Sequence, residues 1–355
     1  MKNRGNMKCG FGSLFLLFPL LLGGIGCDTS LQGIDPPVSA MLRAGCPERR
    51  GVQERERSFE IAERFAPVVL QETGWRPRAD YITRFDFDGN VTGRDNWQHL
   101  GAFPLPAYVY FSVIETETHV FLGYFFFHAA RYGTFFDNDF ESYENDMNGL
   151  LLVLDREAVE RGAGPSESVL FMETRAREQF LQYTNDSRVR QGTEEIDGPI
   201  FFDDADRLWV AVAARHHGVH AATGEEIEGA GSRSIVYRYE GVAGIPRRNS
   251  QQVGYALLPL LTELWPLRAN IGDGRTFDRP FLFGQRCLVG GNFDGDDYLE
   301  DWARPPWSWD ELDDGAVGRG EWFFLPAETV ASHLMLPDPF SLHYTYHPYL
   351  SPAEE

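Results

Sequence analysis

Three runs of residues are apolar along both of the faces that an extended chain presents. The first two, residues 108–114 and 119–128, are rich in aromatic and β-branched residues and are separated by the polar segment 115–118. The third run covers residues 149–154. Because side chains alternate between the two faces of a strand, a strand that is apolar on both faces must be covered on both sides. The sequence therefore predicts a long, buried hairpin at 108–128.

Other segments fill in the expected fold. Residues 208–214 and 234–239 have strand character, whereas apolar residues at helical spacing favour helices at 59–65, 255–265 and 326–334. We expect a mainly β protein, an antiparallel β-sandwich with a few peripheral helices. By count of elements, an α+β description stays open.

The N-terminal segment has the pattern of an export signal. Basic residues at the start precede an apolar run at 11–22, which is too short to span a bilayer. The next segment, Gly24-Ile25-Gly26-Cys27, resembles the lipobox of bacterial lipoproteins, although Gly24 stands where an aliphatic residue is usual. The resemblance implies that Cys27 is lipidated and that the protein is exported and lipid-anchored in the bacterial cell envelope. An ordinary cleaved signal peptide is the alternative.

These patterns divide the chain into four parts. We expect a signal peptide at 1–26, a lipidated tether at 27–56, one β-sandwich domain at 57–340 and a surface tail at 341–355. Beyond the signal and Cys27, two cysteines remain, Cys46 and Cys287. In an oxidising compartment we expect them to form a disulfide, with two separate buried thiols as the alternative.

The charge balance restricts the partners. The chain has 53 Asp and Glu against 32 Lys and Arg, and a net charge of −21. Without the signal peptide, 29 basic residues remain against the same 53 acidic ones, which gives −24. Such a surface repels the phosphate backbone of nucleic acids, so we expect no nucleic-acid partner. It is compatible with a bound cation.

Acidic residues gather at three places that could hold a hard cation. Glu144 and Asp146 stand at the entrance of the strand at 149–154, and period-two alternation places them on one face. Asp86 with Asp88, and Asp294 with Asp296, lie in glycine-containing segments that lack the spacing of an EF-hand loop. Solvated acidic turns are the alternative in each case.

Histidines provide a second kind of candidate. His216, His217 and His220 follow the strand at 208–214, and an imidazole can serve as a metal ligand or as a general base. An exposed histidine-rich loop is the alternative. The sequence contains no G-x-S-x-G, Walker, H-E-x-x-H or C-x-x-C motif.

The order of these features resembles a known arrangement. An aromatic strand ends at His128, Glu144-Asn145-Asp146 follows a polar loop, and a later strand ends near His217. This is similar to the necrosis-inducing toxin family and to the vacuolar protein sorting family numbered sixty-two. The toxin resemblance implies a β-sandwich with a divalent cation in an acidic cavity that recognises sphingolipid head groups.

By position, Glu144 and Asp146 match the acidic motif of the toxin family, and His217 matches its later histidine. The sequence departs from that motif at Tyr143, Met147 and Asn148, where the family has His, Trp and Glu.

We therefore expect a non-enzymatic envelope lipoprotein, held on the membrane by its N-terminal lipid, that binds Ca²⁺ or Mg²⁺ and through it a glycan or lipid head group. The predicted metal ligands are Glu144, Asp146, Asp86, Asp88, Asp294 and Asp296, and the predicted ligand-binding residues are His128, His217 and His220. The alternatives are a metal-assisted extracytoplasmic hydrolase, with His217 moving protons, and a structural envelope protein without a ligand.

Overall fold

The predicted hairpin lies in the middle of a 13-stranded sheet. Strand β2 (Tyr108–Thr116) pairs antiparallel with β3 (His119–Arg131), which pairs along its length with β4 (Tyr143–Asp155). Nearly every residue of these three strands is buried. The two-sided apolar pattern therefore identified the centre of the sheet.

The structure is a computed structural model. It describes residues 52–133, 142–231, 233–247, 251–284, 287–297, 299, 301–311 and 317–350. All of them belong to one unit that spans residues 33–355. The predicted signal peptide, Cys27 and Cys46 lie outside the described residues. Cys287 is disulfide-bonded, and its pairing with Cys46 stays a prediction. None of the described helices is both long and apolar enough to cross a membrane.

The sheet is mixed, with the order β11-β10-β1-β12-β13-β2-β3-β4-β5-β6-β8, β9 beside β10 and β17 beside β2. The other strands of this sheet are β1 (Val68–Glu72), β5 (Val169–Ala176), β6 (Gln179–Tyr183), β8 (Ile196–Gly198), β9 (Phe201–Phe202), β10 (Leu208–Val212), β11 (Val219–Ala221), β12 (Ser234–Tyr239), β13 (Gln252–Pro259) and β17 (Tyr344–Tyr346). Two small sheets join β14 (Pro280–Phe283) to β15 (Cys287–Gly290), and β7 (Arg190–Gln191) to β16 (Leu334–Met335).

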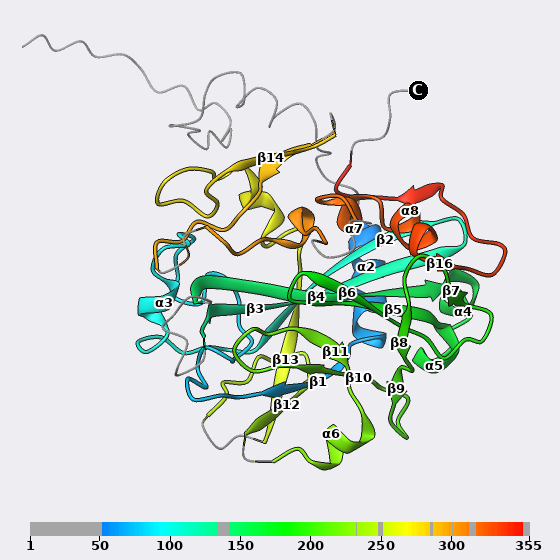
Figure 1. Cartoon of the computed structure of the whole chain (residues 1–355), viewed down its shortest axis with the longest axis horizontal. Coiled ribbons are helices and arrows are strands. Elements are labelled where there is room, and N and C mark those ends of the chain that lie inside the picture. Colours follow the sequence, from blue (N-terminus) through cyan, green and yellow to red (C-terminus); the bar gives the residue numbers. More distant parts are fainter. Residues whose placement is uncertain are drawn as a thin grey trace, which may run out of the picture. The chain divides into compact units, whose positions relative to one another are not determined.

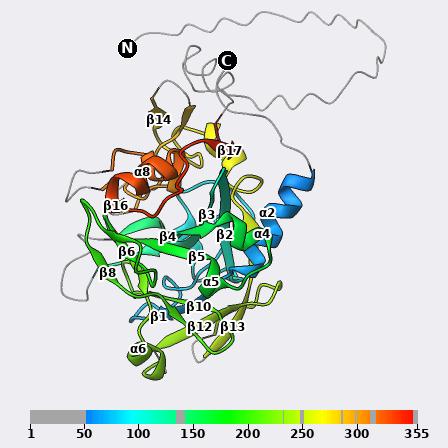
Figure 2. The same cartoon turned by 90° about the vertical axis from the view of Figure 1, so that its right-hand side faces the viewer.

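The mainly β class is as expected, but the antiparallel β-sandwich needs correction. Four neighbouring pairs run parallel: β1 with β10, β12 with β13, β13 with β2, and β6 with β8. Parallel neighbours need a crossover connection, so strands far apart in sequence are interleaved. The strands form one curled sheet, in which β3, β4 and β5 lie above β1, β10, β12 and β13 in both views (Figures 1 and 2).

The helices are short and lie around the sheet. They are α2 (Val52–Arg64), α3 (Asn96–His99), α4 (Arg156–Glu160), α5 (Pro165–Ser168), α6 (Gly224–Glu228), α7 (Glu321–Phe324), α8 (Pro326–His333) and the 3₁₀ turns η1 (Trp265–Ala269) and η2 (Pro306–Ser308). The prediction of a helix at 326–334 is confirmed. The helix predicted at 255–265 is wrong, because residues 252–259 form β13 between β12 and β2.

Two segments differ from the predicted division of the chain. Helix α2 begins at Val52, inside the expected tether, and buries Ile61, Ala62 and Phe65. The expected surface tail contains β17, which pairs with β2, and buries Tyr349. Both segments therefore add to the core.

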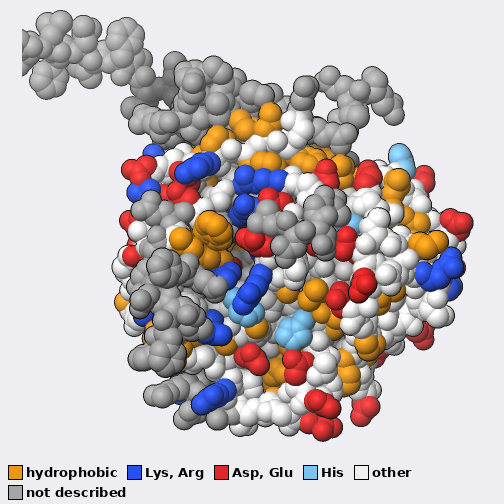
Figure 3. Space-filling model, viewed as in Figure 1, with side chains coloured by type: hydrophobic (Ala, Val, Ile, Leu, Met, Phe, Trp, Pro, Cys, Tyr) orange, Lys and Arg blue, Asp and Glu red, His pale blue; other side chains and the backbone are white. Residues whose placement is uncertain are grey.

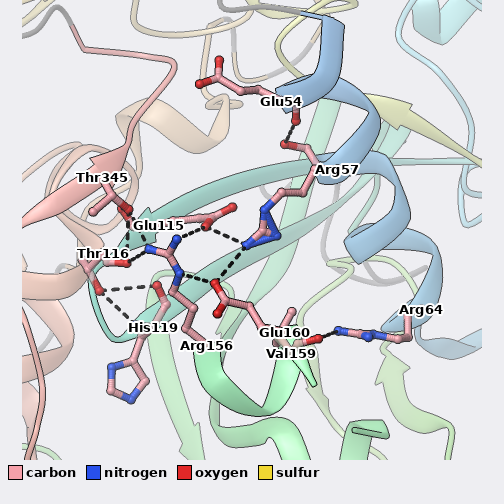
Figure 4. A network of polar contacts seen from close by, with 11 residues as sticks. Glu54, Arg57, Arg64, Glu115, Thr116, His119, Arg156, Val159, Glu160 and Thr345 are labelled. Atoms are coloured by element: carbon pink, nitrogen blue, oxygen red, sulfur yellow. Dashed lines mark hydrogen bonds and ion pairs between the residues drawn. The ribbon is translucent and has the colours of Figure 1, made fainter. Parts of the chain in front are cut away.

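A polar network holds α2 against the hairpin (Figure 4). Arg57 Nη2 lies 3.0 Å from Glu115 Oε2, and Arg156 Nη2 lies 3.8 Å from the same oxygen. Burial raises the pKa of Glu115, while the two guanidinium groups act in the opposite direction. Arg64 donates to the carbonyl oxygen of Val159 at 2.8 Å. The start of the described chain is thereby attached to β2 and α4.

Candidate functional site

Asn145 joins three loops at the start of β4. Its Nδ2 donates to the carbonyl oxygens of Gly93, at 2.9 Å, and Asp294, at 3.1 Å. Its Oδ1 accepts from Asn96 Nδ2 at 2.7 Å. The acidic segments that the sequence places at 86–95, 144–146 and 294–301 therefore meet around one fully buried amide.

The backbone at Asn145 is left-handed, with φ of +59°. Asparagine is one of the few residues that adopt this conformation readily. It interrupts the extended backbone, so Glu144 and Asp146 contact different parts of the molecule. The expectation that they share one face is therefore wrong. Glu144 belongs to a cluster of carboxylates, and Asp146 contacts His217.

The first cluster contains Glu144, Asp296 and Asp297, whose ligand atoms all lie within 4.8 Å of one another. Glu144 is only 3% exposed. Its Oε1 accepts from the backbone N–H of Trp97 at 3.0 Å, and its Oε2 accepts from that of Asp296 at 3.1 Å. Burial raises the pKa of Glu144 to about 7, and the charges of Asp297 and Asp296 act in the same direction.

The second cluster contains Asp278, Asp294 and Asp301. Asp294 is fully buried and accepts from Arg94 Nε and from the backbone N–H of Arg275, both at 3.0 Å. Burial raises the pKa of Asp301 to about 6, with the neighbouring Asp278 and Asp294 carboxyls adding to the shift. Arg94 already compensates part of the negative charge of this cluster.

The third cluster contains Asp88, Asp95 and His99. His99 Nδ1 lies 2.5 Å from Asp88 Oδ2, and Asn90 Nδ2 donates to both carboxylates, at 2.8 Å and 3.1 Å. These contacts hold Asp88 and one oxygen of Asp95, whereas Asp95 Oδ1 is buried and has no hydrogen-bond partner among the described residues.

Asp146 belongs to a buried triad with His217 and Asp80. His217 Nδ1 lies 2.8 Å from Asp146 Oδ2, and its Nε2 lies 3.2 Å from Asp80 Oδ1. His217 is 0% exposed. Burial alone lowers the pKa of His217, but the hydrogen bonds and charges of the two carboxylates outweigh burial and raise it. All three side chains of the triad are buried, and they come from the segment after β1, from β4 and from the turn between β10 and β11.

Local backbone geometry places His217 in the triad. The turn between β10 and β11 holds both Arg215 and His217 at positive φ, +74° and +51°. The N–H of Arg215 donates to Asp80 Oδ1 at 2.7 Å. Asp80 Oδ2 in turn accepts from Tyr132 at 2.7 Å and from the N–H of Gly74 at 2.8 Å. Asp80 therefore binds the turn as well as the imidazole.

The structure separates the other predicted site residues. Asp86 pairs with Arg84, with 2.5 Å between Oδ1 and Nε, and is not in any of the three clusters. His220 pairs with Glu226 at 2.9 Å, away from the triad, because its strand position points it to α6. His128 does lie with His217, and its Nε2 contacts Gln71 Oε1 at 3.0 Å.

Several residues of the clusters were not among the predicted ligands. Asp297 and Asp301 follow the predicted pair at 294 and 296, and Asp95 follows Asp88, so acidic density was the available signal. Asp80 and Asp278 carry no local pattern. Asp80 reaches His217 across 137 residues of sequence.

No protein-family model and no curated protein matches the sequence. Among solved structures, the chain is similar to a protein described as a toxin fold for microbial attack and plant defense, with 12% identity, a TM-score of 0.30 and coverage of 50% of this chain and 72% of that one. It is also similar to necrosis and ethylene inducing protein 2 from the causal agent of witches' broom disease of cocoa, with 12% identity, a TM-score of 0.27 and coverage of 60% and 76%. These neighbours are toxin-fold proteins at low identity and partial coverage.

Proposed function

We propose that the protein is an exported, lipid-anchored protein of the bacterial envelope that binds a divalent cation at Glu144, Asp296 and Asp297. Through this cation it binds a polar glycan or lipid head group. The observation that carries the proposal is the convergence of three carboxylates, one of them almost fully buried, within 4.8 Å. Two oxygens on opposite sides of a Ca²⁺ ion, each at about 2.4 Å, are about this far apart.

The charge of this cluster favours an ion over a structural role. Among the residues that the structure describes, no Lys or Arg forms an ion pair with any of the three carboxylates. Like charges at such short range repel, and a cation removes that repulsion. Glu144 provides a buried ligand, whereas Asp296 is exposed and Asp297 is half-buried. This leaves room for water or a head-group oxygen on the outer side of the ion.

The triad argues against the hydrolase alternative. His217, the residue expected to move protons, is fully buried and is hydrogen-bonded at both ring nitrogens. A general base must reach the proton that it abstracts. We therefore propose a binding function and no catalytic one.

Thermal melting with Ca²⁺ or Mg²⁺ tests the cation site. An ion that binds only the folded state at a concentration of about 100 Kd stabilises by about 2.7 kcal/mol, so we expect wild type to melt several degrees higher. Glu144→Gln and Asp297→Asn should lose this shift. Asp86→Asn is the matched control, because Asp86 pairs with Arg84 and should leave the shift intact. An unchanged melting temperature of wild type with both ions would refute the site.

Fractionation tests the location. If Cys27 carries lipid, wild type expressed in a bacterium stays with the membrane fraction, and Cys27→Ala is recovered in the soluble fraction. Recovery of both proteins in the soluble fraction contradicts the lipid anchor but leaves the cation site untouched.

A further inference from the structure

A pocket of about 770 Å³ lies beside the first turn after β1, between residues 75–81, residues 97–101 and residues 245–247. This volume is in the range of small-molecule sites. Its apolar walls include the side chains of Trp75, Trp97, Tyr81 and Ile245. It is separate from the carboxylate cluster of Glu144, Asp296 and Asp297. Trp97 lines the pocket, and its backbone N–H donates to Glu144.

The charge of the pocket is opposite to that of the chain. Three arginines line it, Arg76, Arg78 and Arg247, and none of its described lining residues is acidic. The whole chain has 53 acidic residues against 32 Lys and Arg. In the face drawn in Figure 3, red acidic side chains are interspersed with blue basic ones. Among its described lining residues the pocket carries only positive charge, so it differs from its surroundings and favours an anion.

Arg76 is the arginine best placed to bind that anion. Its guanidinium lies over the ring of Trp75, at 4.4 Å from the centroid, and 5.3 Å from that of Trp97. It forms no ion pair with any residue in the part of the chain that the structure describes. Arg78, in contrast, donates to the carbonyl oxygens of Leu100 and Phe103, both at 2.5 Å, and is held by the loop.

Part of the aromatic wall is exposed to solvent. Trp75 is 48% exposed and contacts Tyr132 edge to face, with 5.4 Å between centroids. Ile245, which also lines the pocket, is exposed as well. Large apolar side chains that rim a charged pocket are typical of a binding site. The stacked guanidinium keeps its planar fork, which matches a carboxylate or phosphate.

We propose that this pocket binds a small molecule with an acidic group on a six-membered ring. The ligand ring packs against the exposed part of the Trp75 indole, beside the Arg76 guanidinium that lies over it, and the acidic group pairs with Arg76. A sugar acid and an aromatic acid share this chemistry. The proposal does not depend on the cation site.

Calorimetric titration of the full chain with galacturonate and with benzoate tests the proposal. It also distinguishes a sugar acid from an aromatic acid as the ligand. Galactose and benzyl alcohol are the neutral counterparts. We expect saturable binding of one acid, at least tenfold tighter than of its neutral counterpart, because one charge-assisted pair contributes on the order of a factor of ten. The acid that binds identifies the class.

Variants assign the binding to the pocket. Arg76→Gln and Trp75→Ala should each lower the affinity for the acid at least tenfold. Arg76→Lys should lower this affinity less, because it keeps the positive charge. Trp302→Ala is the matched control, since Trp302 is 52% exposed and does not line the pocket. Unchanged melting temperatures exclude misfolding of the variants. Equal binding of acid and neutral compound, binding that survives Arg76→Gln, or no binding of either acid would each overturn the proposal.

Discussion

His128 and His217 stack face to face, with 3.7 Å between ring centroids and 4° between ring planes. Burial lowers the pKa of His128 well below its usual range, and the charge on His217 lowers it further. The carboxylates of Asp146 and Asp80 have the opposite effect on His217, whose pKa is raised in spite of its burial. Of the two stacked rings, the one of His217 therefore binds a proton more readily than the one of His128.

Removal of the charged ring should be costly. His217→Ala leaves Asp80 and Asp146 buried without a cation, and the loss of one partner of a buried ion pair costs about 3–5 kcal/mol of unfolding free energy. Urea denaturation measures this loss. His220→Ala is the control, because its pair with Glu226 is half exposed and should be worth less than about 1 kcal/mol. Equal losses in the two variants would show that the triad has no special role in stability.

The same triad predicts a pH dependence. Because the pKa of His217 is raised in the folded state, its stabilising effect is complete below its ordinary pKa of about 6.5 and is lost as the pH rises through the folded value. The difference in unfolding free energy between wild type and His217→Gln should therefore shrink as the pH rises above about 6.5. An increasing difference over this range would contradict the charged state of His217.

Imidazole NMR provides a direct check on the stacked pair. We expect the ring signals of His128 to remain those of a neutral imidazole from about pH 8 to pH 5, because burial opposes its protonation. The ring signals of the half-exposed His99 and His220 are told apart from those of His128 by comparing spectra of the variants His99→Gln and His220→Gln with wild type. A titration of His128 near its ordinary pKa would refute the neutral assignment.

Cation affinity should depend on pH through Glu144. A proton and a cation compete for this carboxyl, whose pKa is raised to about 7. Between pH 6 and pH 8 the ionised fraction rises from about one tenth to about nine tenths, so the apparent affinity should rise about tenfold. Calorimetric titration at the two pH values measures this change. Affinity that is equal at both values would remove Glu144 from the ligand set.

Asn145 should tolerate few substitutions. Asn145→Ala removes three hydrogen bonds of a buried side chain and puts at this positive φ a residue that adopts the left-handed backbone less readily than Asn does, for an expected loss of about 2–4 kcal/mol. Asn145→Gly removes the same bonds without the backbone strain, and should be about 1 kcal/mol more stable than Asn145→Ala. Denaturation of both variants measures the difference. If Ala and Gly are equivalent, the left-handed backbone at this position stores no strain.

The fold could be predicted where a local pattern decides the structure. The aromatic and β-branched runs identified β2, β3 and β4, because alternation and turn residues are local signals. The sequence predicts a helix from residue 255, inside strand β13, because the leucines of this strand fit helical spacing as well as strand alternation. Its neighbours β12 and β2 decide in favour of a strand, and β2 lies more than 100 residues away in the sequence.

The candidate site could be predicted only in part. The density of acidic residues identified Glu144 and Asp296 as candidates. They are 152 residues apart in the sequence, and no local pattern predicts that they come together. The sequence named both Asp146 and His217 as candidates, but Asp80, which also contacts His217, has no signal of its own. An asparagine between two acidic residues is a signal against their sharing one face of a strand. Asparagine tolerates positive φ, and a residue at positive φ interrupts the alternation of side chains along the strand.

The left-handed turn at Asn145 also affects how mutants of this site must be interpreted. Glu144 and Asp146 are separated by one residue, yet one belongs to the carboxylate cluster and the other to the histidine triad. Substitutions this close together are rarely additive. A loss of cation binding in an Asp146 variant would therefore not make Asp146 a ligand. Only a double-mutant cycle with Glu144 separates direct coordination from a strain transmitted through one shared peptide backbone.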